Sequence, residues 1–318
     1  METEFVYDKS TPILFLVFNR PNTTQQVFEK IKEVEPARLY IAADGPRNSE
    51  EKEKCDEVRR IVSDVTWKCE VILRFHETNL GCKNAVSSAI SWFFEREPEG
   101  IILEDDCLPS NTFFSFCSTL LRVYRNEDKI GHIGGSNFQN GLFRGDGDYY
   151  FSNLTHVWGW AGWRRIWKNY DADMTRFPEA AKKGLLERSP SHQPYKEYWL
   201  HAFEQTHRGM INTWDYQYSF CNLLHGKVSI IPNVNLITNL GFGEDATHTF
   251  GDHPFASLPA ENFQSLIHPS IISADVEADI FTQEIEYQNF EMPPKIQKNF
   301  LSRCWKRIKS FLKKSAKG

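Results

Sequence analysis

Four short apolar runs, separated by helical patterns, constrain the fold more than any other feature of this sequence. The runs are rich in β-branched and aromatic residues, which is typical of buried strands, and lie at residues 12–18, 38–43, 69–75 and 100–103. Between them, apolar residues recur at helical spacing in residues 24–34, 49–63 and 83–95. This alternation predicts an α/β fold, with a mainly parallel, Rossmann-like sheet covered by helices on both faces.

The fourth run ends in three consecutive carboxylates, Glu104, Asp105 and Asp106. Adjacent acids repel one another, so they persist where a cation, hydrogen-bond donors or water neutralise them. Ligands of open α/β sheets bind outside the carboxyl ends of the strands. Carboxylate oxygens there suit Mg²⁺ or Mn²⁺, which in turn binds phosphates. The pattern therefore indicates a metal-assisted phosphate site, and the alternative is a solvated acidic turn.

Composition places the chain among ordinary globular proteins. Of its 318 residues, 41% are hydrophobic and 14% are aromatic, which is enough to build a large core. The seven cysteines are odd in number and include no CxxC pair. This argues against a disulfide framework or a structural zinc site and favours a cytoplasmic location. No apolar run approaches the ~20 residues that a membrane-spanning helix needs.

Charge is distributed unevenly along the chain. Residues 295–318 contain nine Lys or Arg and no acid, which leaves 28 basic and 42 acidic residues in the first 294. Apolar residues repeat at helical spacing from Ile296 to Leu312. We therefore expect a basic amphipathic helix that binds the anionic inner surface of the cell membrane. The alternative is docking on the acidic body or on a partner subunit. Nucleic-acid binding is not expected, because the body is acidic.

The first strand is not followed by a phosphate-binding glycine motif. Neither GxGxxG nor GxxxxGK[ST] occurs in the sequence, and residues 19–24 read Asn-Arg-Pro-Asn-Thr-Thr. A dinucleotide-binding fold or a P-loop is therefore not supported. A nucleotide would have to be held differently.

Several segments, taken in order, resemble the GT-A fold of nucleotide-sugar glycosyltransferases. The resemblance is to the N-acetylglucosaminyltransferase I-like branch, in which Glu-Asp-Asp replaces the usual Asp-X-Asp and an aromatic-rich helix follows, as in residues 104–106 and 111–116. Its Gly-Trp acceptor segment, catalytic Trp-Asp and donor-closing loop have counterparts at residues 157–163, 213–215 and 239–248. The resemblance spans residues 12–250 and implies a bacterial relative, because that family's membrane anchor is missing from this sequence.

The resemblance implies a donor site at the strand ends. Asp106 would hold Mn²⁺ or Mg²⁺, and His248 would be a second ligand or a donor to the diphosphate; the alternative for His248 is a solvated loop histidine. The nucleotide sugar would be bound by Asn19, Arg20, Asp44, Lys83, Glu104 and Asp105, with Asp44 in the place of the family's uracil-reading acid. Alternatively, Arg20 and Lys83 are surface residues, and Glu104 and Asp105 form turn or cap hydrogen bonds.

Asp215 is the candidate general base. It lies between Trp214 and Tyr216, and a carboxylate among large rings is partly desolvated, which makes it a stronger base. The alternative is an aspartate that caps a helix. Tryptophan faces stack on sugar rings, so the acceptor would bind at Trp158, Gly159, Trp160 and Trp214. The alternative for this tryptophan cluster is the hydrophobic core.

These patterns predict an inverting, metal-dependent glycosyltransferase. It would move a hexose or N-acetylhexosamine from a nucleoside diphosphate, such as UDP-GlcNAc, to a hydroxyl of a glycan or lipid-linked glycan. One alternative is a nucleotidyltransferase of sugar phosphates, which usually needs a glycine-rich basic loop after its first strand. Another is a non-catalytic, membrane-peripheral carbohydrate-binding protein.

The predicted organisation is a catalytic domain followed by a spacer and a tail. The catalytic domain would span residues 1–250, with the donor bound by 1–130 and the acceptor by 131–250. Prolines recur in residues 251–294, which indicates an irregular spacer before the basic tail, 295–318.

Overall fold

Eight strands form the central sheet of the computed structural model, which describes residues 5–242, 255–256 and 258–287. The order across the sheet is β3-β2-β1-β4-β8-β6-β9-β7. In chain order, the strands are β1 Ile13–Val17, β2 Arg38–Ala43, β3 Glu70–Phe75, β4 Glu99–Glu104, β6 Ile130–Gly134, β7 Tyr149–Ser152, β8 Trp160–Trp163 and β9 Val228–Pro232. β1 to β4 are mutually parallel, as are β6 and β9, whereas β7 and β8 run antiparallel to their neighbours. The predicted mainly parallel α/β, Rossmann-like fold is confirmed.

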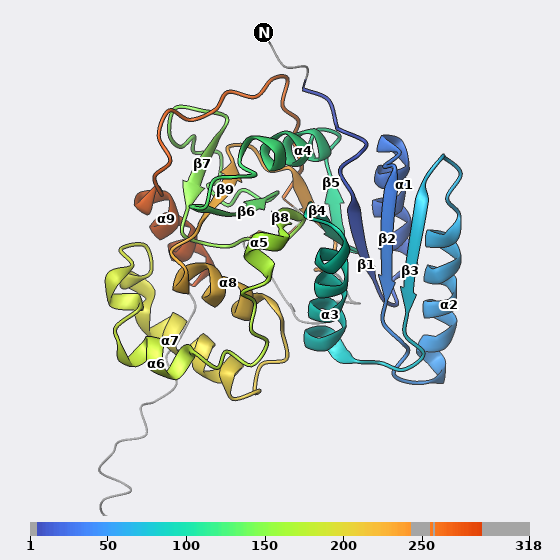
Figure 1. The fold of residues 1–318 in the computed structure, drawn as a ribbon, viewed down its shortest axis with the longest axis horizontal. Helices are drawn as coiled ribbons and strands as arrows, with labels where there is room; N and C mark the ends of the chain where they lie inside the picture. The colour runs from blue at the N-terminus through green and yellow to red at the C-terminus, as the bar shows by residue number, and fades with distance from the viewer. Residues whose placement is uncertain (1–4, 243–254, 257, 288–318) are drawn as a thin grey trace, which may run out of the picture. The chain divides into compact units, whose positions relative to one another are not determined.

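Three helices connect the first four strands: α1 Pro21–Val34, α2 Ser49–Ser63 and α3 Gly81–Arg96. α1 and α2 pack against each other on one face of the sheet, and α3 covers the other face (Figure 1). α1 begins three residues earlier than its apolar spacing predicts, because Pro21 is favoured in the first turn of a helix. Right-handed crossovers of this kind place the carboxyl ends of β1, β2 and β4 at one edge.

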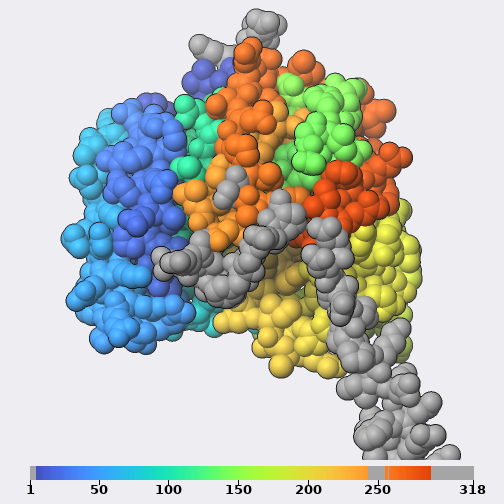
Figure 2. All heavy atoms as spheres, turned by 180° about the vertical axis from the view of Figure 1, so that it is seen from behind, coloured from blue at the N-terminus to red at the C-terminus, as the bar shows by residue number. Residues whose placement is uncertain are grey.

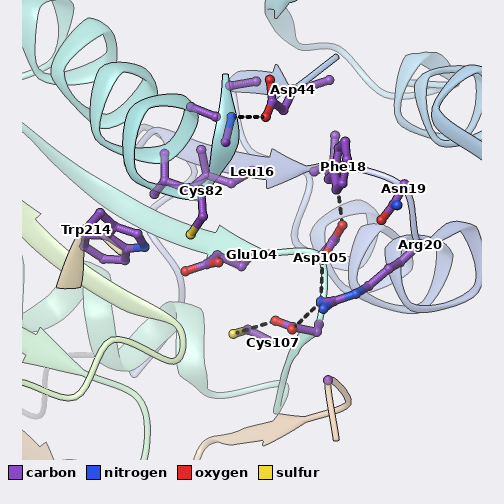
Figure 3. A pocket seen from close by; sticks show the side chains of 18 of the residues that line it. Leu16, Phe18, Asn19, Arg20, Asp44, Cys82, Glu104, Asp105, Cys107 and Trp214 are labelled. Carbon is purple, nitrogen blue, oxygen red and sulfur yellow. Dashed lines mark hydrogen bonds and ion pairs between the residues drawn. The ribbon is translucent and has the colours of Figure 1, made fainter. Parts of the chain in front are cut away.

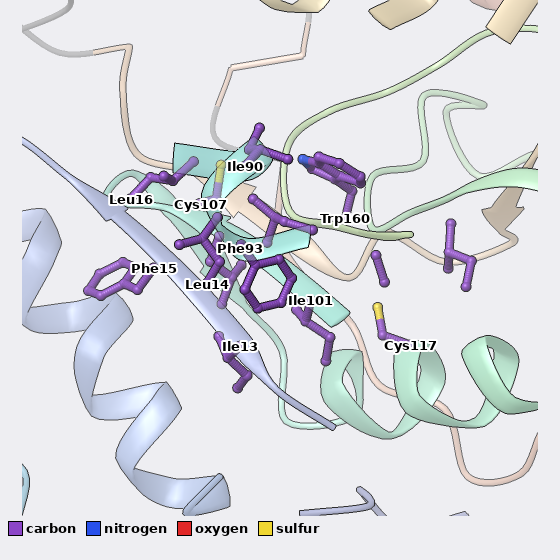
Figure 4. Packing of buried hydrophobic residues seen from close by; sticks show 14 of the residues in the cluster. Ile13, Leu14, Phe15, Leu16, Ile90, Phe93, Ile101, Cys107, Cys117 and Trp160 are labelled. Carbon is purple, nitrogen blue, oxygen red and sulfur yellow. The ribbon is translucent and has the colours of Figure 1, made fainter. Parts of the chain in front are cut away.

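The core of the N-terminal half, residues 5–130, is apolar and closely packed. Strand β1 is buried along its whole length between β2 and β4. Figure 4 shows Ile90 and Phe93 of α3 lying over Leu14 and Ile101 of the sheet. The close approach of α3 depends on Gly100, because a Cβ there would overlap the Phe93 ring.

Shorter elements complete the C-terminal half, residues 131–287, and its junction with the N-terminal half. β5 Cys107–Pro109 pairs antiparallel with β10 Ile237–Asn239. The remaining helices are α4 Phe113–Val123, α5 Arg164–Trp167, α6 Phe177–Lys182, α7 Lys196–His207, α8 Asp215–Leu224 and α9 Val276–Glu286, with 3₁₀ turns at Leu186–Arg188 and Gln193–Tyr195. α8 carries the candidate base at its first residue.

The described part of the predicted spacer is not wholly irregular, since it contains α9. Sequence periodicity missed this helix because its buried face is mostly polar, with Asp279, Thr282 and Gln283 facing inward. Asp279 accepts hydrogen bonds from Ser152 and from the backbone N–H of Asn153, which fixes α9 beside β7. Figure 2 shows residues 258–275, in orange, on the surface between the N-terminal elements and the β7 region.

Residues 1–286 form one contact unit, and residues 287–318 form a second. In the described ranges no helix is both long and apolar enough to cross a bilayer, and the six cysteines there are free. The predicted amphipathic tail, residues 295–318, and His248 lie outside the described residues.

Candidate active site

A pocket with a cavity volume of about 480 Å³ opens at the carboxyl ends of β1, β2 and β4. It lies at the point where the strand order reverses, because β2 and β3 lie on one side of β1 and β4 lies on the other. Ligands of α/β sheets bind in this crevice, and the volume suits a small-molecule ligand. The C-terminal half contributes wall residues from the Trp158 segment, from the start of α8 and from the chain after β10. Figure 3 shows Trp214, next to the start of α8, on this side of the pocket.

Asp105 connects the end of β4 to the loop after β1. Its Oδ2 accepts a hydrogen bond from the backbone N–H of Phe18 at 3.0 Å, and its Oδ1 lies 3.4 Å from the Arg20 guanidinium. Burial, followed by the neighbouring charge of Asp106, raises the pKa of Asp105 to about 7. These contacts correspond to the turn-hydrogen-bond alternative and make Asp105 a positioning residue.

Asp106 lies on the pocket wall, and both of its oxygens are engaged. Its Oδ2 accepts a hydrogen bond from Arg20 Nη1 at 2.5 Å, and its Oδ1 accepts one from the Cys107 thiol at 3.5 Å. Gly241 passes so close that a Cβ there would overlap Oδ2 of Asp106. Glycine is therefore needed for the chain to pass this close to the carboxylate.

Glu104 points into the middle of the pocket, between Cys82 and Cys107 in Figure 3. Burial and then the charges of Asp106, Asp105 and Asp215 raise its pKa to about 8. Within the described residues, the side-chain carboxyl group of Glu104 makes no hydrogen bond or ion pair. Its carboxyl group is therefore available to hydroxyl or N–H groups of a ligand.

The donor atoms at the end of β4 fit a divalent ion that arrives with phosphate. Among the described residues, no three His, Cys, Asp or Glu side chains converge to hold a metal by themselves. Mg²⁺ in phosphate-binding sites usually needs only one or two carboxylates, with phosphates and waters completing its shell. Asp106 and Glu104 supply such oxygens on the wall of the pocket. The residues thus fit a divalent ion that is coordinated by both the protein carboxylates and the phosphates of the substrate.

Asp44 lines the pocket, but its hydrogen bonds hold the protein together. Its Oδ1 accepts from the N–H groups of Gly45 and Leu80, and its Oδ2 accepts from Asn79 Nδ2 and the Gly81 N–H, all at 2.8–3.1 Å. A carboxylate has about four acceptor positions, so none is left for a base. The expectation that Asp44 reads uracil is therefore corrected: Asp44 joins the β2 loop to the start of α3.

Of the other predicted donor residues, Asn19 and Arg20 line the pocket and Lys83 does not. Asn19 donates a hydrogen bond from Nδ2 to Glu51 at 3.1 Å. Lys83 points away from the pocket and pairs with the exposed Asp173 at 3.3 Å. Its predicted phosphate contact is corrected, because the first turn of α3 directs it to the surface.

His76 is a pocket residue that sequence reasoning missed. It follows β3, and its Nε2 is buried without a hydrogen-bond partner in the described part of the chain. Phe18 also lines the pocket, and the Arg47 guanidinium lies 5.4 Å from the centroid of its ring. A polar nitrogen and an aromatic face of this kind suit a planar, hydrogen-bonding group such as a nucleobase. A single histidine after a strand gave no motif by which to find it.

Asp215 begins α8 and faces the same pocket from the C-terminal half. Its Oδ1 accepts hydrogen bonds from the Thr213 hydroxyl and from the Tyr216 N–H. The Thr213 carbonyl in turn accepts a hydrogen bond from Gln217 at 2.7 Å, which fixes the turn. Within the described residues Oδ2 of Asp215 has no hydrogen-bond partner. One oxygen is therefore held in place and the other is available to a ligand.

Two of the four predicted acceptor residues line the pocket, and two do not. Trp158 is partly exposed on the wall and contacts Phe242 edge to face at 5.4 Å. Trp214 also reaches the wall and stacks on Trp160, whose own side chain is only 1% exposed. The acceptor role of Trp160 is therefore corrected to a core position, in agreement with the core alternative.

Gly159 does not line the pocket either, and its predicted acceptor role is corrected. Its φ is +59°, and a Cβ there would lie 2.5 Å from Ile237 Cδ1. Glycine is required because the chain approaches β10 closely in a left-handed conformation. Its role is to place Trp158 at the pocket rim.

No family model matches the chain, and no curated protein does. Solved structures match about half of it. HddC from Yersinia pseudotuberculosis is 11% identical with a TM-score of 0.33, over 50% of this chain and 80% of HddC. 4-diphosphocytidyl-2C-methyl-D-erythritol synthase from Anaerococcus prevotii is 10% identical with a TM-score of 0.33, over 51% and 77%. UDP-glucose pyrophosphorylase complexed with UDP-glucose is 10% identical with a TM-score of 0.31, over 50% and 78%.

At identities of 10–11% and TM-scores of 0.31–0.33 the similarity carries no argument about function. The function has to be argued from the pocket itself.

Proposed function

We propose that this chain is an enzyme that moves a sugar from a nucleoside diphosphate to an acceptor hydroxyl. The observation that carries the proposal is a single pocket with two chemically different sides. Glu104 and Asp106 lie at the end of β4, in the N-terminal half, and Asp215 enters from the C-terminal half. The β4 side suits a metal-bound diphosphate, and Asp215 suits an acceptor hydroxyl.

The charge of the pocket favours sugar transfer over nucleotidyl transfer. A nucleotidyltransferase must hold a nucleoside triphosphate and a sugar phosphate together, which requires several cations. The arginines of the described wall are Arg20 and Arg47, and both already pair with acids: Arg20 with Asp105 and Asp106, and Arg47 with Glu51. A pocket with so little free positive charge suits one diphosphate that brings a divalent ion better than it suits a triphosphate and a sugar phosphate together.

The proposed reaction assigns a separate task to each side. A Mn²⁺ or Mg²⁺ ion at Asp106 would offset the charge of the leaving diphosphate. Asp215, held by Thr213 and Tyr216 through Oδ1, takes the proton of the acceptor hydroxyl at Oδ2. A single carboxylate of this kind suffices for direct displacement, so we expect inversion at the anomeric carbon.

The finer assignments rest on the resemblance stated from the sequence. We propose a UDP-linked donor, such as UDP-GlcNAc, and a glycan or lipid-linked glycan acceptor that stacks on Trp158. The basic tail would hold the protein on the anionic inner face of the cell membrane. His248 would assist at the diphosphate.

The proposal is tested by incubating the protein with Mn²⁺, a panel of nucleotide sugars and candidate glycan acceptors, and measuring nucleoside diphosphate release and product. Asp215→Asn should reduce transfer by ~10²–10⁴-fold. Asp173→Asn is the matched control, because Asp173 is an exposed acid of the same half that lies outside the pocket wall. Pyrophosphate release from a nucleoside triphosphate and a sugar phosphate would instead identify a nucleotidyltransferase. Glycan binding without turnover of any donor would identify a carbohydrate-binding protein.

A further inference from the structure

Arg20 neutralises the carboxylate at which the proposed function places a divalent ion. Its Nη1 lies 2.5 Å from Oδ2 of Asp106 and 3.4 Å from Oδ1 of Asp105 (Figure 3). The three side chains are mostly buried, with exposures of 17% for Arg20, 17% for Asp106 and 8% for Asp105. Water and salt therefore screen these contacts weakly.

Asp105 and Asp106, the two acids of the β4 end that contact Arg20, differ in how firmly they are held. Asp105 is fixed by the backbone N–H of Phe18 at 3.0 Å. The Arg20 backbone is fixed as well, since it is the N-cap of α1 and Pro21 follows it. Asp106 faces the open pocket beside Gly241. Asp105 is therefore the anchor of the guanidinium, whereas Asp106 is the partner that a ligand can reach.

The charges in the pocket make this arrangement incompatible with a bare diphosphate. Asp215 lines the same wall, and within the described residues no ion pair neutralises it. A nucleoside diphosphate adds two or three negative charges, and one guanidinium cannot neutralise both it and Asp106. A second cation must enter, and the oxygen that it would bind is the one that Arg20 occupies.

We propose that Arg20 and a divalent ion compete for Asp106, and that arrival of the ion transfers the Arg20 guanidinium from Asp106 to the diphosphate, with Asp105 as the pivot. This inference rests on the proposed function. Without ligand, the ion pair avoids an uncompensated buried carboxylate. With ligand, the ion replaces Arg20 at Asp106, and the released guanidinium donates hydrogen bonds to phosphate oxygens.

Removing Arg20 should then change two affinities in opposite directions. In Arg20→Gln, Mn²⁺ alone, measured by electron paramagnetic resonance without nucleotide, should bind about tenfold more tightly, because Asp106 has lost its competitor. UDP at saturating Mn²⁺, measured by calorimetry, should bind about tenfold more weakly, because a phosphate contact is lost. Arg20→Met should behave in the same way and serves if Arg20→Gln does not fold.

Two control variants separate competition from general damage. Arg20→Lys keeps the positive charge, so its Mn²⁺ affinity should stay within about threefold of the wild-type value. Arg47→Gln removes another arginine of the same wall, one that pairs with Glu51 and not with the β4 acids. Its affinity for Mn²⁺ alone should change by less than about twofold. Melting temperatures of all variants report whether each is folded.

Four results would overturn the inference. If both affinities fall in Arg20→Gln and Arg20→Met, Arg20 only shapes the loop; if neither changes, Arg20 takes no part. If the wild-type protein binds UDP with Mn²⁺ but the variants do not bind Mn²⁺ more tightly, this inference fails while the proposed function stands. If the wild-type protein binds neither UDP nor a nucleotide sugar with Mn²⁺, the proposed function fails, and the inference fails with it.

Discussion

The two halves of the protein reach the same pocket with different kinds of interior. Residues 5–130 enclose apolar strands, and β1 is buried along its whole length. Residues 131–287 bury many polar groups, among them His132, Gln139, Asp279 and Gln283. The N-terminal half follows the regular βα pattern that places strand ends at one edge. The C-terminal half depends on individual hydrogen bonds, such as those that Asp279 accepts from Ser152 and Ser191.

This difference suggests how the proposed work is divided. β4 ends at Glu104, and Asp106 lies in the short turn between β4 and β5, so regular strands on both sides position these acids for binding of a nucleotide. The first turn of α8, fixed by side-chain hydrogen bonds to Thr213, positions Asp215 for the reacting group. Binding of the donor should therefore depend on the N-terminal half, and the chemical step on the C-terminal half.

The largest expected effects test this division directly. Asp106→Asn should weaken UDP binding in the presence of Mn²⁺ by about 10²-fold, because the ion loses its carboxylate. Asp215→Asn should leave UDP binding within about threefold while transfer falls by ~10²–10⁴-fold. Calorimetry measures the first quantity and product formation the second. An Asp106→Asn protein with unchanged Mn²⁺ dependence and turnover would contradict both the site and the division.

A glycine of the C-terminal half should have the next largest effect, on stability. Gly159→Ala combines a left-handed backbone with a Cβ 2.5 Å from Ile237, so we expect a loss of roughly 2–4 kcal/mol in the free energy of unfolding. Gly226→Ala is the control, because its φ is also +59° but nothing lies within 4 Å of the added Cβ. It should cost only about 1 kcal/mol. Equal losses in urea denaturation would show that the contact with β10 is unimportant.

The same contrast explains how much of the fold could be predicted. β1 to β4 and the helices between them follow from apolar runs and helical spacing, because burial of strands needs such runs. α9 could not be found in this way, since its buried face consists mainly of Asp279, Thr282 and Gln283. Hydrogen-bond partners from distant segments make that face stable, and they are invisible in the local sequence.

For the candidate site, the sequence indicated which residue types take part, but it was less informative about which way their side chains point. The acids that end β4, together with Asp215 and Trp158, line one pocket. Lys83 and Trp160 do not, because the orientation of a side chain on its helix or strand depends on packing. Asp44 lines the pocket, but its carboxylate already accepts four hydrogen bonds from the loops after β2 and β3. That all acceptor positions of this carboxylate are occupied becomes visible only when the positions of the loops are known.

A third prediction concerns acid stability, which should depend on the C-terminal half. Burial lowers the pKa of His132 to about 3 and those of His156 and His192 to about 4. Below pH 6.5 these histidines bind protons in the unfolded chain but stay neutral in the native protein. The free energy of unfolding therefore falls as the pH falls. For His132 alone the loss between pH 7 and pH 5 is about 2 kcal/mol.

His132→Phe tests this effect while keeping a ring against Trp160, on which His132 stacks at 5.3 Å. The variant loses a hydrogen bond to the His156 carbonyl, so it should be less stable at pH 7. Its stability should nevertheless fall less steeply between pH 7 and pH 5, by about 2 kcal/mol relative to the wild type. Parallel curves of unfolding free energy against pH would show that His132 takes up a proton as readily in the native protein as in the unfolded chain.

The smallest expected effect concerns an ion pair that joins the two halves. Lys83 of α3 pairs with Asp173, and the two side chains are 21% and 81% exposed. An ion pair with one partner in open solvent contributes little, so Lys83→Gln should change the free energy of unfolding by less than about 0.5 kcal/mol. UDP affinity should stay within about twofold of the wild-type value, because Lys83 points away from the pocket. A tenfold loss would mean that Lys83 turns inward when the donor binds, so that α3 would contribute a phosphate contact that the ligand-free pocket does not contain.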